Sequence, residues 1–269
     1  MSGRICEMTG NDRHHVFVSP HPDDVVLSCG GTLARLQHLG CPVQVVTVFA
    51  EEPTGSHVSP FGKRHMLMWD AGPSPFAVRR KEDQRALALL GARGWYGQYL
   101  DAPFRRHAVD GRWLYQNDDA LFGMPDPSEG DVPQRVAGEI ATICGETPAV
   151  IYVPLGIGRH VDHVLLAAAG HHLRRVGYQV FWYEEFPYAL QEGFPLRWEA
   201  RGWEAHLVPL TTAEVSLKVQ AILCYRSQLP SLFGDERHVY RTVVDYMLTV
   251  SGQGYPAERY WTPPTKYEQ

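Results

Sequence analysis

Short apolar runs alternate with helical patterns along most of this chain. Four runs are rich in β-branched and aromatic side chains, which is typical of buried strands: 16–20, 43–50, 149–154 and 179–184. Five segments repeat apolar residues at helical spacing: 26–39, 76–90, 132–143, 162–176 and 211–223. Strands that alternate with helices of about 10–15 residues predict a mostly parallel sheet with right-handed crossovers. We therefore expect an α/β fold with a Rossmann-like, mostly parallel sheet flanked by helices, in a single domain spanning residues 1–269.

Two segments interrupt this alternation. Residues 51–75 are rich in Pro and Gly and are expected to form a long loop, and residues 101–131 are expected to be irregular. Loops of that length in compact domains are usually functional or mobile. Both segments carry large apolar side chains that could wall a binding site: Phe61, Met66, Met68, Trp69, Trp113, Tyr115 and Phe122.

The helix expected over 76–90 has two faces. Ala77, Leu87 and Leu90 are predicted to form its apolar face. The opposite face carries four charged residues: Arg79, Arg80, Glu82 and Asp83.

Composition narrows the class of protein. The 269 residues carry a formal net charge of -5, which gives no reason to expect nucleic acid or an anionic membrane as a partner. The amino end does not show the charged and apolar regions of a secretory signal, and no apolar run has transmembrane length, so we expect a cytoplasmic protein. The five cysteines are scattered and never spaced as Cys-x-x-Cys, which argues against a disulfide framework and against a cysteine zinc site.

The first chemically informative cluster is His21-Pro22-Asp23-Asp24. It follows the apolar run 16–20 directly and precedes a helix. Carboxylates are costly to bury, so a packed strand end tolerates two of them only if hydrogen bonds or a cation stabilise them. Ligands of open α/β sheets also bind beyond the carboxyl ends of the strands. An isolated Asp-Asp at a helix start, however, is usually a cap.

The second cluster is Gly158-Arg159-His160-Val161-Asp162-His163, again between a strand and a helix. His160 and His163 share one side of the first helical turn. Alone, such a pair is more often a solvated helix start than a ligand set. Beside the first cluster it predicts a metal site, because two histidines and one aspartate leave a position open for water, as in catalytic zinc sites. The same ligands accept other divalent ions.

These two clusters contain more acids and bases than a metal needs. One of Asp23 and Asp24 can bind the metal while the other acts as a base. One histidine can bind while the other, oriented by Asp162, stays protonated for a leaving amine. The residues alone therefore predict metal-assisted hydrolysis and leave the assignment of each side chain open.

In these motifs and their order the chain resembles the PIG-L/LmbE family of zinc-dependent N-acetylglucosamine deacetylases. The resemblance rests on His-Pro-Asp-Asp after a strand, Gly30-Gly31 in the next helix and His-x-Asp-His downstream. It covers about residues 16–228, with weaker support from 79–83, 183–188, Lys218 and 225–228.

The resemblance implies a role for each residue of the two clusters. His21, Asp24 and His163 would bind zinc, and Asp23 would be the general base. His160 would stabilise the transition state and protonate the amine, and Asp162 would hold and charge His160.

The resemblance also implies that Arg79 or Arg80, and Asp101, hold the sugar hydroxyls. Arg79 and Arg80 could equally be part of a solvated helix face, and Asp101 could simply begin a turn.

The chain departs from the family's pattern at three positions. Val25 stands where many members have Glu, and Val161 where many have Pro. Gly158 stands where some members place a tyrosine that polarises the amide oxygen. None of these changes removes a ligand.

The expected function is a zinc-dependent hydrolase that removes the N-acetyl group from an N-acetylglucosaminyl-type sugar. Its substrate would be a small-molecule conjugate, either a glycosylated natural product, a sugar-lipid or a thiol glycoside. Two alternatives stay open: a metal-dependent hydrolase of another amide or ester, and a sugar- or nucleotide-binding α/β module without catalysis. The spare groups Asp23 and His160 favour catalysis. A homo-oligomer is compatible with the sequence.

Overall fold

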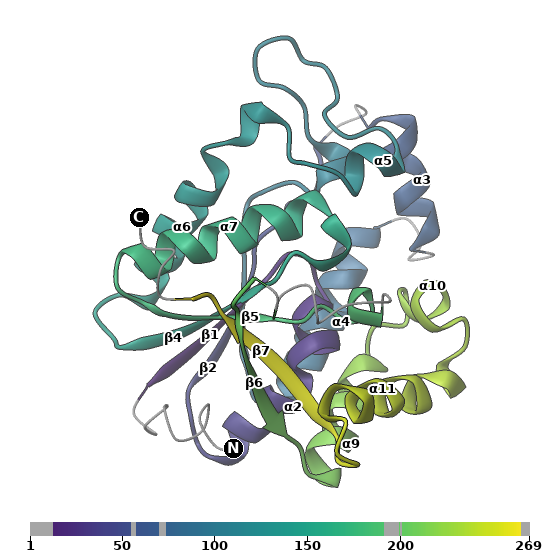
Figure 1. Cartoon of the computed structure of the whole chain (residues 1–269). Helices are drawn as coiled ribbons and strands as arrows, with labels where there is room; N and C mark the ends of the chain where they lie inside the picture. The colour runs from purple at the N-terminus through teal and green to yellow at the C-terminus, as the bar shows by residue number, and fades with distance from the viewer. Residues whose placement is uncertain (1–12, 55–57, 70–73, 191–198, 200, 265–269) are drawn as a thin grey trace.

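The computed structural model describes residues 13–54, 58–69, 74–190, 199 and 201–264. Its centre is a seven-stranded sheet in the order β3-β2-β1-β4-β5-β7-β6 (Figure 1). The strands are β1 (His14–Ser19), β2 (Val43–Thr47), β3 (Arg93–Tyr96), β4 (Ala149–Pro154), β5 (Gln179–Tyr183), β6 (Glu204–Pro209) and β7 (Ala257–Thr262). All pairs among the first five strands are parallel, and β7 pairs antiparallel with both β5 and β6. The expectation of a mostly parallel sheet is confirmed, and the order 3-2-1-4-5 is that of a Rossmann-like fold.

Helices cover both faces of the sheet (Figure 1). One face packs against α2 (Asp24–His38), α4 (Pro75–Leu89), α9 (Thr212–Ile222) and α11 (Glu236–Ser251). The other packs against α6 (Val132–Cys144) and α7 (Val161–Arg175). Residues alternate between the two cores, as in any strand that is buried on both faces: Phe17 belongs to the first core, Val16 and Val18 to the second.

The remaining described elements are short. They are α3 (Pro60–Met68), α5 (Asp118–Leu121), α10 (Leu229–Phe233) and the 3₁₀ turns Ala102–Phe104, Pro127–Glu129, Ile157–Arg159 and Tyr188–Leu190.

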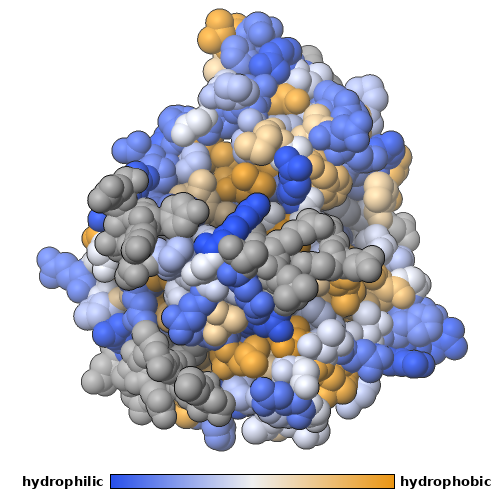
Figure 2. All heavy atoms as spheres, in the orientation of Figure 1, coloured by the Kyte–Doolittle hydropathy of each residue, from blue (hydrophilic) through white to orange (hydrophobic). Residues whose placement is uncertain are grey.

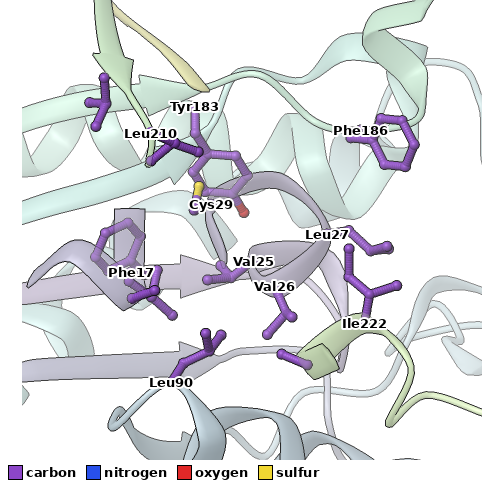
Figure 3. Packing of buried hydrophobic residues seen from close by; sticks show 14 of the residues in the cluster. Phe17, Val25, Val26, Leu27, Cys29, Leu90, Tyr183, Phe186, Leu210 and Ile222 are labelled. Carbon is purple, nitrogen blue, oxygen red and sulfur yellow. The ribbon is translucent and has the colours of Figure 1, made fainter. Parts of the chain in front are cut away.

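Helix α2 packs closely on α9 because two consecutive glycines face it. A Cβ on Gly30 would lie 2.9 Å from Cγ of Lys218, and a Cβ on Gly31 would clash with Leu210. Val25, at the position where many family members have Glu, is instead buried in this core beside Phe17 (Figure 3). The helix that begins at Asp24 is thereby fixed on the sheet over its whole first half.

The expectation of a loop over residues 51–75 is wrong for its middle part, where α3 runs from Pro60 to Met68. The Ser59 hydroxyl accepts a hydrogen bond from the backbone N–H of Gly62, and Pro60 occupies the first helical position. Both are helix-start signals. Residues 55–57 and 70–73 of this segment lie outside the described residues.

The expected faces of α4 are wrong in part. Leu87 and Leu90 are buried as expected. Ala77 is exposed, whereas Arg79, Glu82 and Asp83 are buried. Burial is possible because each charge has partners. The Glu82 carboxylate accepts hydrogen bonds from the backbone and hydroxyl of Ser227. Arg79 and Asp83 face the segment that holds the first histidine, which is described next.

Candidate metal and catalytic site

Both sequence clusters lie at the carboxyl edge of the sheet, where its order reverses. His21 follows β1, and His160, Asp162 and His163 follow β4, the parallel neighbour of β1. The chain leaves β1 toward β2 on one side, and β4 lies on the other. This is the switch point at which open α/β sheets bind their ligands.

A tight turn connects β1 to α2. The Ser19 hydroxyl donates to the carbonyl of His21 and accepts from the N–H of Val25. The N–H of His21 donates to the Asp24 carboxylate at 2.9 Å. Asp23 adopts φ of 107°, which is a strained backbone for a residue with a side chain. Such strain is typical of functional sites.

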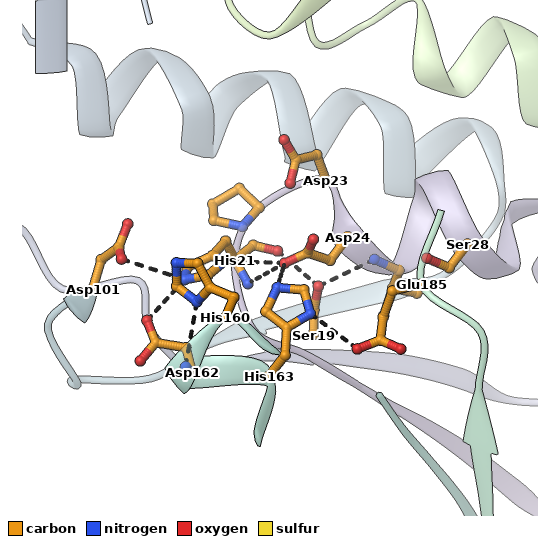
Figure 4. A network of polar contacts seen from close by, with 12 residues as sticks. Ser19, His21, Asp23, Asp24, Ser28, Asp101, His160, Asp162, His163 and Glu185 are labelled. Atoms are coloured by element: carbon orange, nitrogen blue, oxygen red, sulfur yellow. Dashed lines mark hydrogen bonds and ion pairs between the residues drawn. The ribbon is translucent and has the colours of Figure 1, made fainter. Parts of the chain in front are cut away.

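The three expected ligands form one cluster (Figure 4). Oδ2 of Asp24 lies 3.1 Å from Nδ1 of His21 and 3.5 Å from Nε2 of His163. One donor atom from each of the three residues fits within 4.8 Å of the others, and all three residues are buried. A buried set of two imidazoles and one carboxylate fits a divalent cation with an open position.

The second ring nitrogen of His163 has a partner of its own. Nδ1 lies 3.2 Å from the Glu185 carboxylate, which also accepts backbone hydrogen bonds from Leu155, Gly156 and Ile157. A carboxylate behind a histidine ligand orients the ring and raises its basicity. Sequence reasoning did not assign Glu185 a role, although it noted the stretch 183–188.

The second ring nitrogen of His21 likewise faces carboxylates. Nε2 lies 3.0 Å from Asp162 and 3.4 Å from Asp101. Asp162 is fully buried and pairs with the Arg105 guanidinium, which holds its pKa well below the usual range although burial opposes this. Arg105 is a second residue that sequence reasoning missed, because nothing in 101–131 marked it as buried.

His160 stands beside this cluster with its ring centre 5.0 Å from that of His21. Its Nδ1 accepts a hydrogen bond from the backbone N–H of Asp162 at 3.3 Å, and the Asp162 carboxylate makes its own bonds with His21 and Arg105. Burial lowers the pKa of His160 to about 3, so the ring is neutral at rest. A nearby cation would lower that pKa further.

Asp23 points away from the bonded network (Figure 4). Its carboxylate lies 3.6 Å from the Arg79 guanidinium, which also donates to the carbonyl of Pro22 and stacks on Trp69. Burial raises the pKa of Asp23 to about 7, while Arg79 opposes this rise. The carboxyl group is therefore close to half-ionised at neutral pH, which suits a general base.

The three expected sugar-binding residues lie together. Arg79, Arg80 and Asp101 line one hollow with Phe49 and Phe76, directly beside Pro22. Among the described residues, Nε of Arg79 and Oδ1 of Asp101 are buried without a hydrogen bond, and Oδ1 lies 3.4 Å from Nε2 of His21. The structure thus brings all nine candidate residues of the sequence to one site.

The large apolar side chains of segments 51–75 and 101–131 differ in how far they are exposed at the site. Phe61, Trp69 and Tyr115 are buried and support the site from behind. Phe122 is exposed and its ring lies 5.5 Å from that of His160, and Met68 and Met124 are exposed as well. On the face shown in Figure 2, apolar side chains form small patches among polar ones.

A Rossmann-like sheet with a buried His₂Asp donor set and a spare carboxylate at its switch point defines a metal-dependent hydrolase. The model of the family "PIG-L: GlcNAc-PI de-N-acetylase" matches residues 16–173. The chain belongs to this family, and the resemblance seen in its motifs is confirmed.

Two relatives of this chain and a similar solved structure are also deacetylases. The chain is 33% identical to the 2'-N-acetylparomamine deacetylase of Niallia circulans, over 85% of this chain and 86% of that one. It is 30% identical to the enzyme of the same name from Streptomyces fradiae, over 92% and 89%. The zinc-inhibited form of a teicoplanin deacetylase matches with a TM-score of 0.78 and 28% identity, over 92% of this chain and 97% of that one. The expected fold, deacetylase class and divalent metal are confirmed.

None of the helices in the described part of the chain combines the length and the apolar character needed to cross a bilayer.

Proposed function

We propose that this chain is a metal-dependent N-deacetylase that hydrolyses the acetamido group of an N-acetylglucosaminyl-type sugar on a small-molecule conjugate. One observation carries the proposal. The Asp23 carboxylate stands beside a complete donor set, is not needed as a ligand and is held by Arg79 with a pKa of about 7. A module that only binds sugar or nucleotide has no use for such a group.

His21, Asp24 and His163 would hold the cation, zinc or another divalent ion. When bound, this cation would polarise the acetamide carbonyl and acidify a water molecule. Asp23 takes the proton of the attacking water. Because its pKa lies near neutrality, Asp23 can also release that proton toward the departing amine.

His160 contributes as a neutral ring. Its Nδ1 accepts the N–H of Asp162, so the proton of the neutral tautomer resides on Nε2. We propose that this N–H holds the leaving nitrogen by a hydrogen bond, and that the proton passes to the amine from Asp23. Asp162 keeps its carboxylate on His21 and supports His160 through its backbone.

The hollow beside Pro22 encloses only about 10 Å³, so it would receive a single hydroxyl group of the sugar, with the ring outside it. Asp101 and the two arginines offer a carboxylate and guanidinium groups for this hydroxyl. Phe122, Met124 and Met68 offer exposed apolar surface for the rest of the conjugate. Two relatives that match over 85% and 92% of this chain are named for 2'-N-acetylparomamine, and we therefore favour an aminoglycoside-type natural product over a glycopeptide. A sugar-lipid or a thiol glycoside is the next candidate.

Acetate release from a panel of N-acetylglucosaminyl compounds tests the proposal. Metal-stripped protein should be inactive and should recover with one equivalent of zinc. The best substrate of the panel names the class of conjugate. Stoichiometric zinc binding without acetate release from any compound would contradict the proposal and favour another amide or a binding role.

Four further expectations stay predictions from the sequence. These are a single domain over residues 1–269, a cytoplasmic location, no nucleic-acid partner and compatibility with a homo-oligomer.

A further inference from the structure

Tyr188 packs against the turn that carries the second histidine cluster. Gly158 adopts φ of +77° in this turn, and a Cβ on it would clash with the ring atoms of Tyr188. Real side chains do not approach so closely, so the Tyr188 ring fills the space in front of residue 158. Any residue other than glycine at 158 would displace this ring.

The same ring lies beside a ligand. The Tyr188 ring meets the His163 ring edge-on, with centres 5.5 Å apart and planes at 85°. Tyr188 follows Glu185 by three residues, and the N–H of Ala189 donates to the carbonyl of Glu185. One short segment, 185–188, therefore contacts His163 twice. Glu185 contacts Nδ1 of the ring, and the Tyr188 ring packs edge-on against it.

The Tyr188 hydroxyl differs from the other tyrosine hydroxyls of the core. Those of Tyr183 and Tyr225 donate to the carbonyl of Val18 and the carboxylate of Asp83. Within the described residues, the structure records no hydrogen bond for the Tyr188 hydroxyl. A phenol has a pKa of about 10, so at neutral pH this hydroxyl carries its proton and can donate a hydrogen bond.

The reaction can use such a donor in addition to the cation. When water oxygen bonds to the acetamide carbon, the carbonyl electron pair moves onto its oxygen, and the charge that develops there is negative. The side chains nearest the donor set are carboxylates and the neutral His160, which is aimed at the leaving nitrogen in our proposal. A neutral hydroxyl on a ring that packs against His163 can stabilise that oxygen without adding charge to the resting site.

We propose that Tyr188 is a further catalytic residue, whose hydroxyl donates a hydrogen bond to the acetamide oxygen as negative charge develops on it. This inference rests on the proposed function and adds one residue to it. The hydroxyl keeps its proton throughout, so the proton balance between water, Asp23 and the amine is unchanged.

The test is Tyr188→Phe, which removes one oxygen atom and keeps the ring against Gly158 and His163. The expected result is a fall in kcat of about 100-fold with a small change in KM, as for the loss of one oxyanion donor. Zinc content and melting temperature should not change. Tyr178→Phe is the matched control, since Tyr178 is half-buried at the opposite end of β5.

Binding supplies a readout that does not depend on turnover. A phosphonamidate analogue of the acetamido sugar carries a tetrahedral centre with a charged oxygen. Tyr188→Phe should bind it about 100-fold more weakly and should bind the free amino sugar as the wild type does.

The possible failures are distinguishable. A wild-type protein that neither releases acetate nor binds the analogue overturns the proposed function, and this inference with it. An active wild type with an equally active Tyr188→Phe variant overturns only the role of Tyr188. A Tyr188→Phe variant that loses zinc also overturns it, because the residue would then support His163 and not the substrate.

Discussion

His163 and Glu185 form a buried pair in which Nδ1 of the ring lies 3.2 Å from Oε1 of the carboxylate. The three consecutive backbone N–H groups of residues 155–157 donate to the same carboxylate and fix its position. His163 is thereby left with Nε2 toward Asp24 as the atom that can bind a cation. The backbone of the turn after β4 thus fixes Glu185, which follows β5, and Glu185 in turn fixes the His163 ring.

Replacing Glu185 with Gln should weaken zinc binding about 10- to 100-fold, because the amide polarises the imidazole less than the carboxylate does. Competition with a chelator of known affinity measures the effect. Glu184→Gln is the matched control. Its carboxylate binds Arg259 and Trp261 and does not touch a ligand, so zinc affinity should stay within about threefold. An equal loss in both variants would show that the effect is one of general stability.

Asp23→Asn and Asp24→Asn should separate the base from the ligand. Asp23→Asn should keep one equivalent of zinc and lose turnover by about 10²- to 10⁴-fold, since the amide cannot accept a proton. Asp24→Asn should lose zinc as well, because its carboxylate faces both histidine ligands. Metal analysis and acetate release on the same preparations measure both effects. Zinc loss in Asp23→Asn with retention in Asp24→Asn would reverse the two assignments.

The parallel half of the fold was predictable because its strands and helices follow simple periods. Each of the four predicted strands and five predicted helices corresponds to an observed element within a few residues. Four larger elements were not predicted: the parallel edge strand β3, the antiparallel strands β6 and β7, and the helix α11. β6 begins with the exposed Glu204 and Ala205, and β7 mixes charged and aromatic residues, so neither shows a continuous apolar run. β7 also pairs with β5 from far along the chain, which local patterns do not indicate.

The site was predictable where its residues lie in short motifs at strand ends. The six residues of the two clusters meet because β1 and β4 are neighbours in the sheet, whereas Arg79 and Arg80 reach the site from α4 and Asp101 from the segment after β3. Supporting groups such as Arg105 and Glu185 were not predictable, since their roles depend on burial and on contacts between distant segments. Arg79 was expected to hold sugar, and the structure adds a contact with Asp23 that no spacing could reveal.

Replacing Arg79 with Met should shift the pH dependence of activity. Burial raises the pKa of Asp23 to about 7, and the Arg79 charge opposes that rise. A base works when deprotonated, so activity should increase with pH through this pKa. Without the guanidinium, the rise should move to higher pH by about 1 to 3 units.

The measurement is kcat/KM against pH for zinc-loaded protein. Arg80→Met is the control for this rise, because Arg80 donates to the carbonyl of Ala50 and stacks on Tyr96. Its loss should change KM without moving the rise. If the pH of this rise shifted only in Arg80→Met, or in neither variant, the prediction that Arg79 controls the pKa of Asp23 would be wrong.

His15 should make the protein sensitive to acid at a point far from the site. Its ring is fully buried in β1, with Nδ1 3.1 Å from the Tyr152 hydroxyl, and burial lowers its pKa to about 4 from 6.5. Between pH 6.5 and about 4, the unfolded state therefore binds a proton on His15 that the folded state does not bind. His15 therefore does not change the free energy of unfolding above pH 6.5, and it lowers that free energy as the pH falls toward 4, by up to about 3 kcal/mol.

Urea unfolding with a chelator present measures the effect. The His15→Phe variant should lose less free energy of unfolding between pH 7 and pH 4.5 than the wild type. A substitution at the exposed His238 should lose as much as the wild type does. Parallel curves for wild type and His15→Phe would assign the acid sensitivity to other groups.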